Sequence, residues 1–282
     1  MSVIHDLWRV SRGKLRVGLL LWFGSAAALC PSNARAKRPT SVPCHSHNDY
    51  EREQPLKIAL FARFQSVEAD LWLSAGKIMV AHWPWAYAGS LEDLYLMPLK
   101  ALLTQRKTVH EDGKPFFLWL DLKDGRDEFR PKLAKLLCAY SHISPAVQVV
   151  LTGSESQREK LLREYPLQVQ YDHGSYRDDD PESDGRWTWY SLAWRNYFHW
   201  RGHGEMPETE RLQLREMIAK IHAKGRHVRF YEAPETAELW RLLAEEGVDL
   251  IGTDQVGVLG KAFKFLTSGT TLGNPIQETE FP

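Results

Sequence analysis

After residue 40 the chain alternates short apolar runs typical of β-strands with longer amphipathic segments, and this alternation limits its possible folds more than any other feature. The predicted strands cover residues 41–47, 66–73, 116–123, 147–152, 167–172, 189–194, 227–232 and 249–254. The predicted helices cover residues 55–64, 91–106, 128–140, 156–164, 208–224 and 235–246. Eight strands joined mostly by helices favour an α/β fold of the closed TIM (β/α)₈ barrel type. An open doubly wound sheet usually has a glycine-rich turn after its first strand, and none follows residues 41–47.

The composition suits one globular domain and narrows the classes of partner. The chain has 282 residues, of which 43% are hydrophobic, and this is enough for a sizeable core. Its 36 basic residues equal its 36 acidic residues, whereas a nucleic-acid-binding protein normally has a basic excess. Three cysteines are too few for a disulfide scaffold. We expect no nucleic-acid partner, and the sequence sets no oligomeric state.

Residues 1–36 have the layout of a secretory signal peptide. An uncharged apolar run at 17–29 follows a basic stretch, and Ala34 and Ala36 occupy the −3 and −1 positions of a cleavage site. A membrane-spanning helix needs about 20 apolar residues, so a retained N-terminal anchor is the weaker alternative. We therefore predict an exported protein, periplasmic or secreted, with a single domain at 37–282 and at most peripheral membrane contact. Cleavage would leave Cys44 and Cys138, and the sequence does not decide whether they pair.

Polar residues recur in pairs near the carboxyl ends of the predicted strands. Three pairs are spaced i, i+2: His45 with His47, Glu68 with Asp70, and Asp121 with Lys123. Alternate side chains of a strand share one face, so both members of each pair point the same way. In a TIM barrel, inward-facing residues at the carboxyl ends of the strands line the mouth where active sites are built. Arg229 and Asp254 belong to the same rim.

The three carboxylates of this set predict a metal site. Glu68, Asp70 and Asp121 lie on otherwise apolar strands, and burying them near one another without a cation would be costly. One divalent cation, Mg²⁺ or Ca²⁺, removes that cost, because both ions prefer carboxylate oxygens. A salt-bridge cluster with Lys123 is the structural alternative.

A further histidine can reach the same mouth. His82 comes after a glycine-centred hairpin signal at residues 74–77, so the chain can fold back over the barrel there. Two histidines beside one hard metal suit phosphate-ester chemistry. One imidazole takes a proton from the attacking hydroxyl, and the other gives a proton to the leaving oxygen. The metal and Lys123 would stabilise charge on the phosphoryl oxygens.

These residues resemble the superfamily of phosphatidylinositol-specific phospholipase C and glycerophosphodiester phosphodiesterase. The likeness is strongest to the subfamily that contains altered inheritance of mitochondria protein 6. It extends over residues 41–265 and is carried by HSHNDY at 45–50, VEAD at 67–70, VRF at 228–230 and Thr253-Asp254, among other short matches. Sphingomyelinase D enzymes look similar at the first histidine, at the Glu-x-Asp pair and at Asp121-Leu122-Lys123.

The resemblance implies a metal-dependent phosphoric diester hydrolase acting on a small-molecule or lipid substrate, glycerophosphodiester-like or phospholipid-like. It implies His45 and His82 as the acid–base pair and Glu68, Asp70 and Asp121 as metal ligands. We expect Asn48, Lys123 and Arg229 to bind phosphate. The typical glycerophosphodiesterase signature has Arg-Gly after the first histidine and Asp after the second, where this chain has Ser46-His47 and Trp83. This departure concerns which alcohol the substrate contains more than it concerns the class of reaction.

Two other functions stay open at this point. His45-x-His47 together with Asp254 is also the pattern of zinc-dependent amidohydrolase barrels, with His173 and either His199 or His203 completing the site. A catalytically silent binding barrel is the non-enzyme alternative, because a fold does not guarantee an activity.

The tryptophans fall into two groups. We interpret the cluster around residues 187–200 as packing, and Trp83 and Trp85 as candidates for an apolar lip beside the site.

Overall fold

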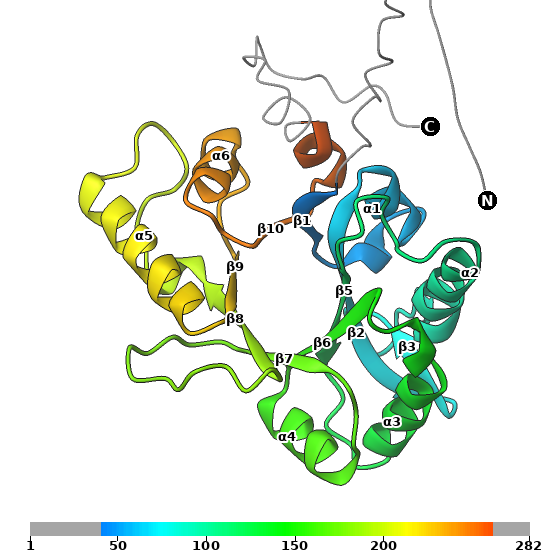
Figure 1. Ribbon diagram of the computed structural model, residues 1–282. Helices are drawn as coiled ribbons and strands as arrows, with labels where there is room; N and C mark the ends of the chain where they lie inside the picture. The colour runs from blue at the N-terminus through cyan, green and yellow to red at the C-terminus, as the bar shows by residue number, and fades with distance from the viewer. Residues whose placement is uncertain (1–40, 262–282) are drawn as a thin grey trace, which may run out of the picture. The chain divides into compact units, whose positions relative to one another are not determined.

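A computed structural model describes residues 41–261, and the predicted signal peptide lies outside these residues. Within them, all eight predicted barrel strands are present (Figure 1). They are β1 (Val42–Ser46), β2 (Phe64–Ser74), β5 (Phe116–Leu122), β6 (Val147–Gly153), β7 (Gln170–His173), β8 (Trp187–Ala193), β9 (His227–Tyr231) and β10 (Leu250–Thr253).

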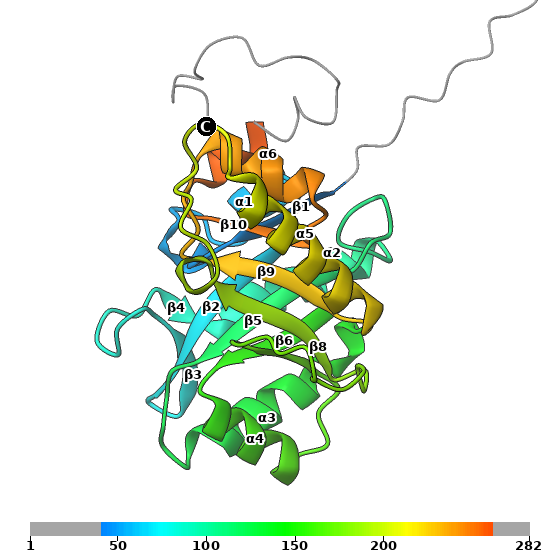
Figure 2. The same cartoon turned by 90° about the vertical axis from the view of Figure 1, so that its left-hand side faces the viewer.

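These strands form one closed parallel barrel. Each strand pairs with its neighbour in the order β1, β10, β9, β8, β7, β6, β5, β2, and β1 also pairs with β2, which closes the ring. All eight of these pairings are parallel. The arrowheads of β8 and β9 in Figure 2 point toward the same end of the barrel. The predicted TIM-barrel fold is therefore confirmed.

The predicted helices are present outside the barrel, shorter by a few residues at some ends. They are α1 (Lys57–Phe61), α2 (Met97–Gln105), α3 (Phe129–Ala139), α4 (Glu155–Glu164), α5 (Glu208–Ala223) and α6 (Ala237–Glu245). Short 3-10 turns are η1 (Asp49–Glu51), η3 (Ser141–Ile143) and η4 (Trp194–Asn196), and one π-helical turn, η2 (Glu92–Leu96), precedes α2. Among the described residues, no helix is long and apolar enough to cross a membrane.

Local sequence signals account for several helix ends. Ser154 and Thr236 cap α4 and α6, because their side-chain oxygens accept hydrogen bonds from the backbone N–H groups of the first turn. Gly225 and Gly247 follow α5 and α6 with φ of +69° and +83°, a left-handed conformation that costs glycine little.

The structure also contains two short strands beyond the eight. β3 (Lys77–Val80) pairs antiparallel with the extended end of β2, and β4 (Gly89–Ser90) pairs with β3. The hairpin signal at residues 74–77 indicated the turn between β2 and β3. The loop from β3 to β4 carries His82, and it begins beside Asp70, because Val80 pairs with Leu71 and the backbone N–H of Ala81 donates to the backbone oxygen of Asp70.

The barrel interior and the space beneath the helices hold separate apolar clusters. Inside the barrel, Trp119, Val150, Trp189 and Leu250 pack together, and Phe117 packs against them. The larger cluster lies between the strands and the surrounding helices. Trp189, Trp194 and Trp200 are all buried, as expected for packing, whereas Trp83 and Trp85 are exposed.

Candidate active site

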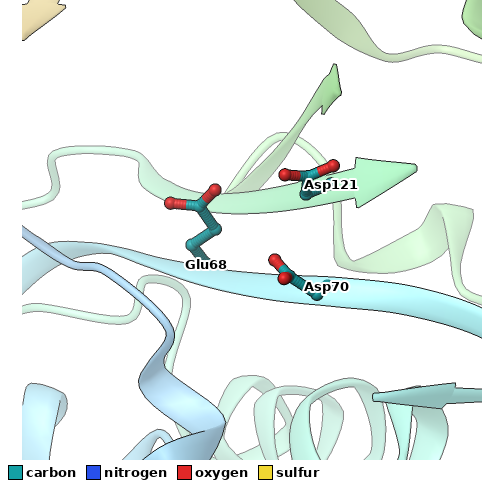
Figure 3. Close-up of side chains that lie close together, drawn as sticks. All are labelled: Glu68, Asp70 and Asp121. Carbon is teal, nitrogen blue, oxygen red and sulfur yellow. The ribbon is translucent and has the colours of Figure 1, made fainter. Parts of the chain in front are cut away.

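Three carboxylates meet at the carboxyl ends of β2 and β5. Glu68 and Asp70 come from β2, and Asp121 comes from β5 directly beside Asp70 in the strand register. One oxygen from each of the three lies within 4.8 Å of the others (Figure 3). The alternation along β2 points both of its carboxylates to the inside of the barrel, as the i, i+2 spacing predicted.

The chemistry of this carboxylate cluster fits a divalent cation. Oδ2 of Asp70 and Oδ1 of Asp121 are buried and accept no hydrogen bond. Burial, together with the negative charge of Asp121, raises the pKa of Asp70 to about 7. Burial also raises the pKa of Asp121, against the opposing charge of Lys123. Buried carboxylate oxygens that accept no hydrogen bond and repel one another fit Mg²⁺ or Ca²⁺, because both ions prefer oxygen ligands.

A glycine on β6 makes room for this cluster. Gly153 has a φ of +83°, and a Cβ placed there would collide with Oδ1 of Asp121. Because any other residue would carry that Cβ, the position requires glycine for both its backbone conformation and the space beside Asp121. No sequence signal indicated this role, because a glycine at the end of a strand is common where a loop begins.

His45 is fully buried at the end of β1 and contacts the cluster. Its Nδ1 lies 2.8 Å from the hydroxyl oxygen of Ser66, and its Nε2 lies 2.8 Å from Oε2 of Glu68. Nη1 of Arg229 is also 2.8 Å from this Nε2, so the imidazole nitrogen faces both a carboxylate and a guanidinium. Burial and the charge of Arg229 lower the pKa of His45 to about 4, so the ring is neutral near pH 7.

Arg229 joins His45 to the cluster from β9. Its Nη1 donates to Oε2 of Glu68 at 3.2 Å, and its guanidinium carbon lies 4.1 Å from the centroid of the Trp119 ring. Despite burial, the charge of Arg229 and the hydrogen bond with His45 hold the pKa of Glu68 well below its usual range. Glu68 therefore stays ionised, the state in which a carboxylate can bind a cation.

Lys123 and His82 approach from the other side of the cluster. Nζ of Lys123 lies 2.6 Å from Oδ2 of Asp121 and 3.5 Å from Oδ2 of Asp70. Nδ1 of His82 lies 3.4 Å from Oδ2 of Asp70, and the His82 side chain is 44% exposed. The two histidines thus come from separate segments of the chain, His45 beside Glu68 and His82 beside Asp70. The contacts of Lys123 also supply part of the salt-bridge cluster considered as the structural alternative.

Asn48 and His47, which follow the first histidine closely in the sequence, make hydrogen bonds to residues outside the carboxylate cluster. The side-chain oxygen of Asn48 accepts a hydrogen bond from the Tyr50 hydroxyl, and Asn48 does not line the cavity beside the cluster. Its role in binding phosphate stays a prediction. His47 does line that cavity, and its Nδ1 lies 2.9 Å from Oδ1 of Asp254.

The zinc site of the alternative function has no support in the geometry. Within residues 41–261, the carboxylate cluster is the single group of histidine, cysteine or acidic side chains compact enough to hold a metal ion. His47 contacts Asp254, as the zinc pattern requires, but Nε2 of His45 faces Glu68 and Arg229, so the two histidines do not share a metal position. Cys44 is buried and Cys138 is exposed, and both are free thiols.

A cavity of about 530 Å³ extends from the cluster across β6, β7 and β8. Several of its lining residues were not predicted: Thr152, Arg158, Asp172, Ser175 and Ser191. Asp172 is the last residue of a predicted strand, and this position is the one sequence feature that could have indicated its place at the barrel mouth. Burial raises the pKa of Asp172 to about 6, although the charge of Arg229 lowers it.

Comparison with known proteins finds relatives in sequence and in fold. The AIM6-like phosphodiesterase domain family matches residues 35–116, a segment that contains both histidines of the site and its first two carboxylates. The altered inheritance of mitochondria protein 6 homolog of Arthroderma benhamiae is 26% identical over 264 residues, covering 76% of this chain and 82% of the relative. Altered inheritance of mitochondria protein 6 of Kluyveromyces lactis is 32% identical over 127 residues, which are 43% of this chain and 29% of that protein.

Solved structures show the same fold at low sequence identity. A glycerophosphodiester phosphodiesterase from Parabacteroides distasonis has a TM-score of 0.52 and 15% identity, covering 83% of this chain and 99% of that one. A putative glycerophosphodiester phosphodiesterase from Galdieria sulphuraria has a TM-score of 0.53 and 16% identity, covering 81% and 99%.

The chain thus shares its barrel fold with glycerophosphodiester phosphodiesterases, and in sequence it is similar to the AIM6-like phosphodiesterase domain family. The similarity to AIM6 proteins includes the motifs at residues 45–50 and 67–70, on which the sequence resemblance was based.

Proposed function

We propose that the chain is a metal-dependent phosphoric diester hydrolase that works with two histidines. The observation that carries this proposal is the carboxylate cluster, with its three oxygens within 4.8 Å of one another and one histidine at each of its β2 members. Glu68, Asp70 and Asp121 would hold one divalent cation, Mg²⁺ or Ca²⁺. When bound, the cation offsets negative charge on the phosphoryl oxygens.

The two histidines have environments suited to different tasks. His45 is buried and neutral, so it can take a proton from the attacking hydroxyl as the general base. His82 lies on an exposed loop beside Asp70, where it can give a proton to the leaving oxygen as the general acid. The roles of general base and general acid can also be exchanged between the two histidines, since both contact the carboxylate cluster. Lys123 and Arg229 place two positive charges where the phosphate would lie.

The site suits phosphodiesters better than carboxamides. Carboxamide hydrolysis in zinc barrels uses histidine ligands, and the cluster here is made of oxygen ligands. The presence of both histidines and all three carboxylates also argues against a silent binding barrel.

The test is hydrolysis of a panel of phosphodiesters by the purified chain, with EDTA and with Mg²⁺ or Ca²⁺ added back. We expect activity that EDTA abolishes and the cation restores, and loss of at least 100-fold in His45→Ala and His82→Ala. His199→Ala is the matched control, because His199 is exposed and does not line the cavity. Unchanged activity in both His45→Ala and His82→Ala would contradict the mechanism.

We also propose that the domain acts outside the cytosol, on the basis of residues 1–36. N-terminal sequencing of the protein recovered from its native host tests this, with cleavage after Ala36 as the expected result. An intact N-terminus on a membrane-bound protein would favour the retained anchor instead.

A further inference from the structure

The loop between β3 and β4, residues 81–88, presents two large apolar rings to solvent. Trp83 and Trp85 are 55% and 75% exposed. Their rings are stacked on each other, with centroids 5.6 Å apart and planes 10° from parallel. Two rings that stack in solvent bury much less area than rings in the core, so the stability of the fold does not account for their position.

The backbone of this loop is held in place without the two rings. The N–H of Ala81 donates to the backbone oxygen of Asp70 at 3.1 Å, and the N–H of Ala88 donates to that of Val80 at 2.9 Å. Nε1 of Trp72, on β2, donates to the backbone oxygen of Ala81 at 2.9 Å. Because none of these bonds involves the two stacked indoles, we expect the loop to keep its conformation when either ring is removed.

The imidazole of His82, on the same loop, is held weakly by its polar contact. Its Nδ1 lies 3.4 Å from Oδ2 of Asp70, which is long for a hydrogen bond, and its side chain is 44% exposed. The His82 ring also meets the Trp83 ring at 88°, with centroids 4.8 Å apart. Perpendicular contacts between aromatic rings are favourable, so this contact favours the orientation in which Nδ1 faces Asp70.

We propose that Trp83 and Trp85 form a positioning pair for His82: Trp83 holds the imidazole toward Asp70, and Trp85 holds Trp83 by stacking. This inference rests on the proposed function for the acid–base role of His82. A group that transfers a proton must lie within hydrogen-bond reach of the reacting oxygen, so an imidazole that turns into solvent loses its effect. His45 needs no such pair, because it is buried with a partner at each ring nitrogen.

The first test observes the imidazole by NMR and needs no turnover. In the full chain with isotope-labelled histidine, the His82 ring signals are assigned by their loss in His82→Ala, at about pH 9 so that histidines are neutral. The ring current of a nearby indole shifts such signals. We therefore expect them to move toward the position of free histidine in Trp83→Ala, and by a smaller amount in Trp85→Ala. The matched control is Met97→Ala, which removes a 51% exposed side chain on α2 and should leave them unchanged.

The second test measures whether the indoles act through His82. With the water-soluble diester that wild type cleaves fastest, we expect Trp83→Ala to lower kcat about fivefold at unchanged KM, which corresponds to about 1 kcal/mol. Trp83→Phe keeps a ring and should stay within about twofold of wild type. In the His82→Ala background, Trp83→Ala should cause no additional loss, because its effect depends on the imidazole.

The outcomes separate the two proposals. His82 signals that are the same in wild type and Trp83→Ala overturn the positioning pair, whether or not the protein hydrolyses diesters. Losses that add in the double substitution, or that occur only with diesters in phosphatidylcholine vesicles, also overturn it and favour an apolar lip that contacts the substrate. His82 signals that depend on Trp83, in a protein that hydrolyses no diester, support the positioning pair and contradict the proposed hydrolase.

Discussion

The guanidinium of Arg229 lies over the indole ring of Trp119, 4.1 Å from its centroid, in the interior of the barrel. The same guanidinium reaches His45 and Glu68 through Nη1, while its Nε is buried without a hydrogen-bond partner. The Trp119 ring also meets the His45 ring edge to face, with centroids 5.6 Å apart. One core side chain on β5 therefore supports both the arginine and the buried histidine of the site.

We predict that Trp119→Leu lowers kcat/KM for a phosphodiester about 30-fold, because a desolvated cation–π contact contributes about 2 kcal/mol. Trp119→Phe keeps a ring under the guanidinium and should retain activity within about threefold of wild type. The control is Trp189→Leu, since Trp189 packs against Trp119 in the same apolar cluster, whereas the cation–π contact of Arg229 is with Trp119. Equal activity losses in Trp119→Leu and Trp189→Leu would show that Trp119 acts through stability alone.

Gly153→Ala should impair the carboxylate cluster without unfolding the barrel. The added Cβ displaces Asp121, so we expect cation affinity to fall about 10-fold or more, alongside a backbone cost of about 1 kcal/mol for the positive φ. Gly113→Ala is the matched control, because Gly113 has a similar φ of +78° and no atom lies within 4 Å of the new Cβ. Calorimetric titration with Mg²⁺ and urea unfolding of both variants check this; equal cation affinities would contradict it.

Asp70→Asn should raise the stability of the cation-free protein. The substitution removes one of three buried, mutually repelling carboxylates, so thermal unfolding in EDTA should occur a few degrees higher than in wild type. Saturating Mg²⁺ should stabilise wild type and have little effect on Asp70→Asn. A variant that is less stable than wild type in EDTA would favour the salt-bridge alternative, in which Asp70 mainly pairs with Lys123.

Stability should depend on pH through a second cluster, at the amino ends of the strands. Asp249 lies 2.8 Å from Nε2 of His222 and 2.9 Å from Nδ1 of His227, and its Oδ2 accepts from the N–H of Val228. The hydrogen bond with Asp249 raises the pKa of His222, and despite burial the bonds from both histidines lower the pKa of Asp249 to about 2.

The sign of the pH effect follows from these two shifts. The contribution of His222 is complete below its unfolded pKa of about 6.5 and declines as pH rises through the raised value. The contribution of Asp249 is present above about pH 4 and declines as pH falls toward 2. We therefore predict that His222→Gln loses more stability relative to wild type at pH 5 than at pH 8.5, by well under 1 kcal/mol because the imidazole is 40% exposed. Urea unfolding at both pH values measures the difference, and an equal loss at both would contradict the assignment.

The sequence predicted the parts of the site that follow from strand periodicity. Glu68 and Asp70 alternate along one strand, and parallel strands of a barrel bring their carboxyl ends together, so their meeting with Asp121 follows from the fold. The short extra strands β3 and β4 were not predicted as strands, because four and two residues are too few to show a period.

Features that depend on tertiary packing were not predictable. Arg158 belongs to α4, whose charged sequence ESQREKLLRE is typical of an exposed helix, yet Arg158 is buried against Asp172. Trp119 has the sequence context of an ordinary core residue, and its contact with Arg229 joins residues 110 positions apart. Which face of α4 is covered, and which ring lies under the arginine, are set by the barrel as a whole.

Cation binding by the carboxylate cluster can be measured most directly by isothermal titration of the EDTA-stripped chain with Mg²⁺ and Ca²⁺. We predict one site per chain for wild type, loss of that site in both Glu68→Gln and Asp121→Asn, and an unchanged site in Asp249→Asn. No binding by wild type, or a site of equal affinity and stoichiometry in all four proteins, would contradict the account.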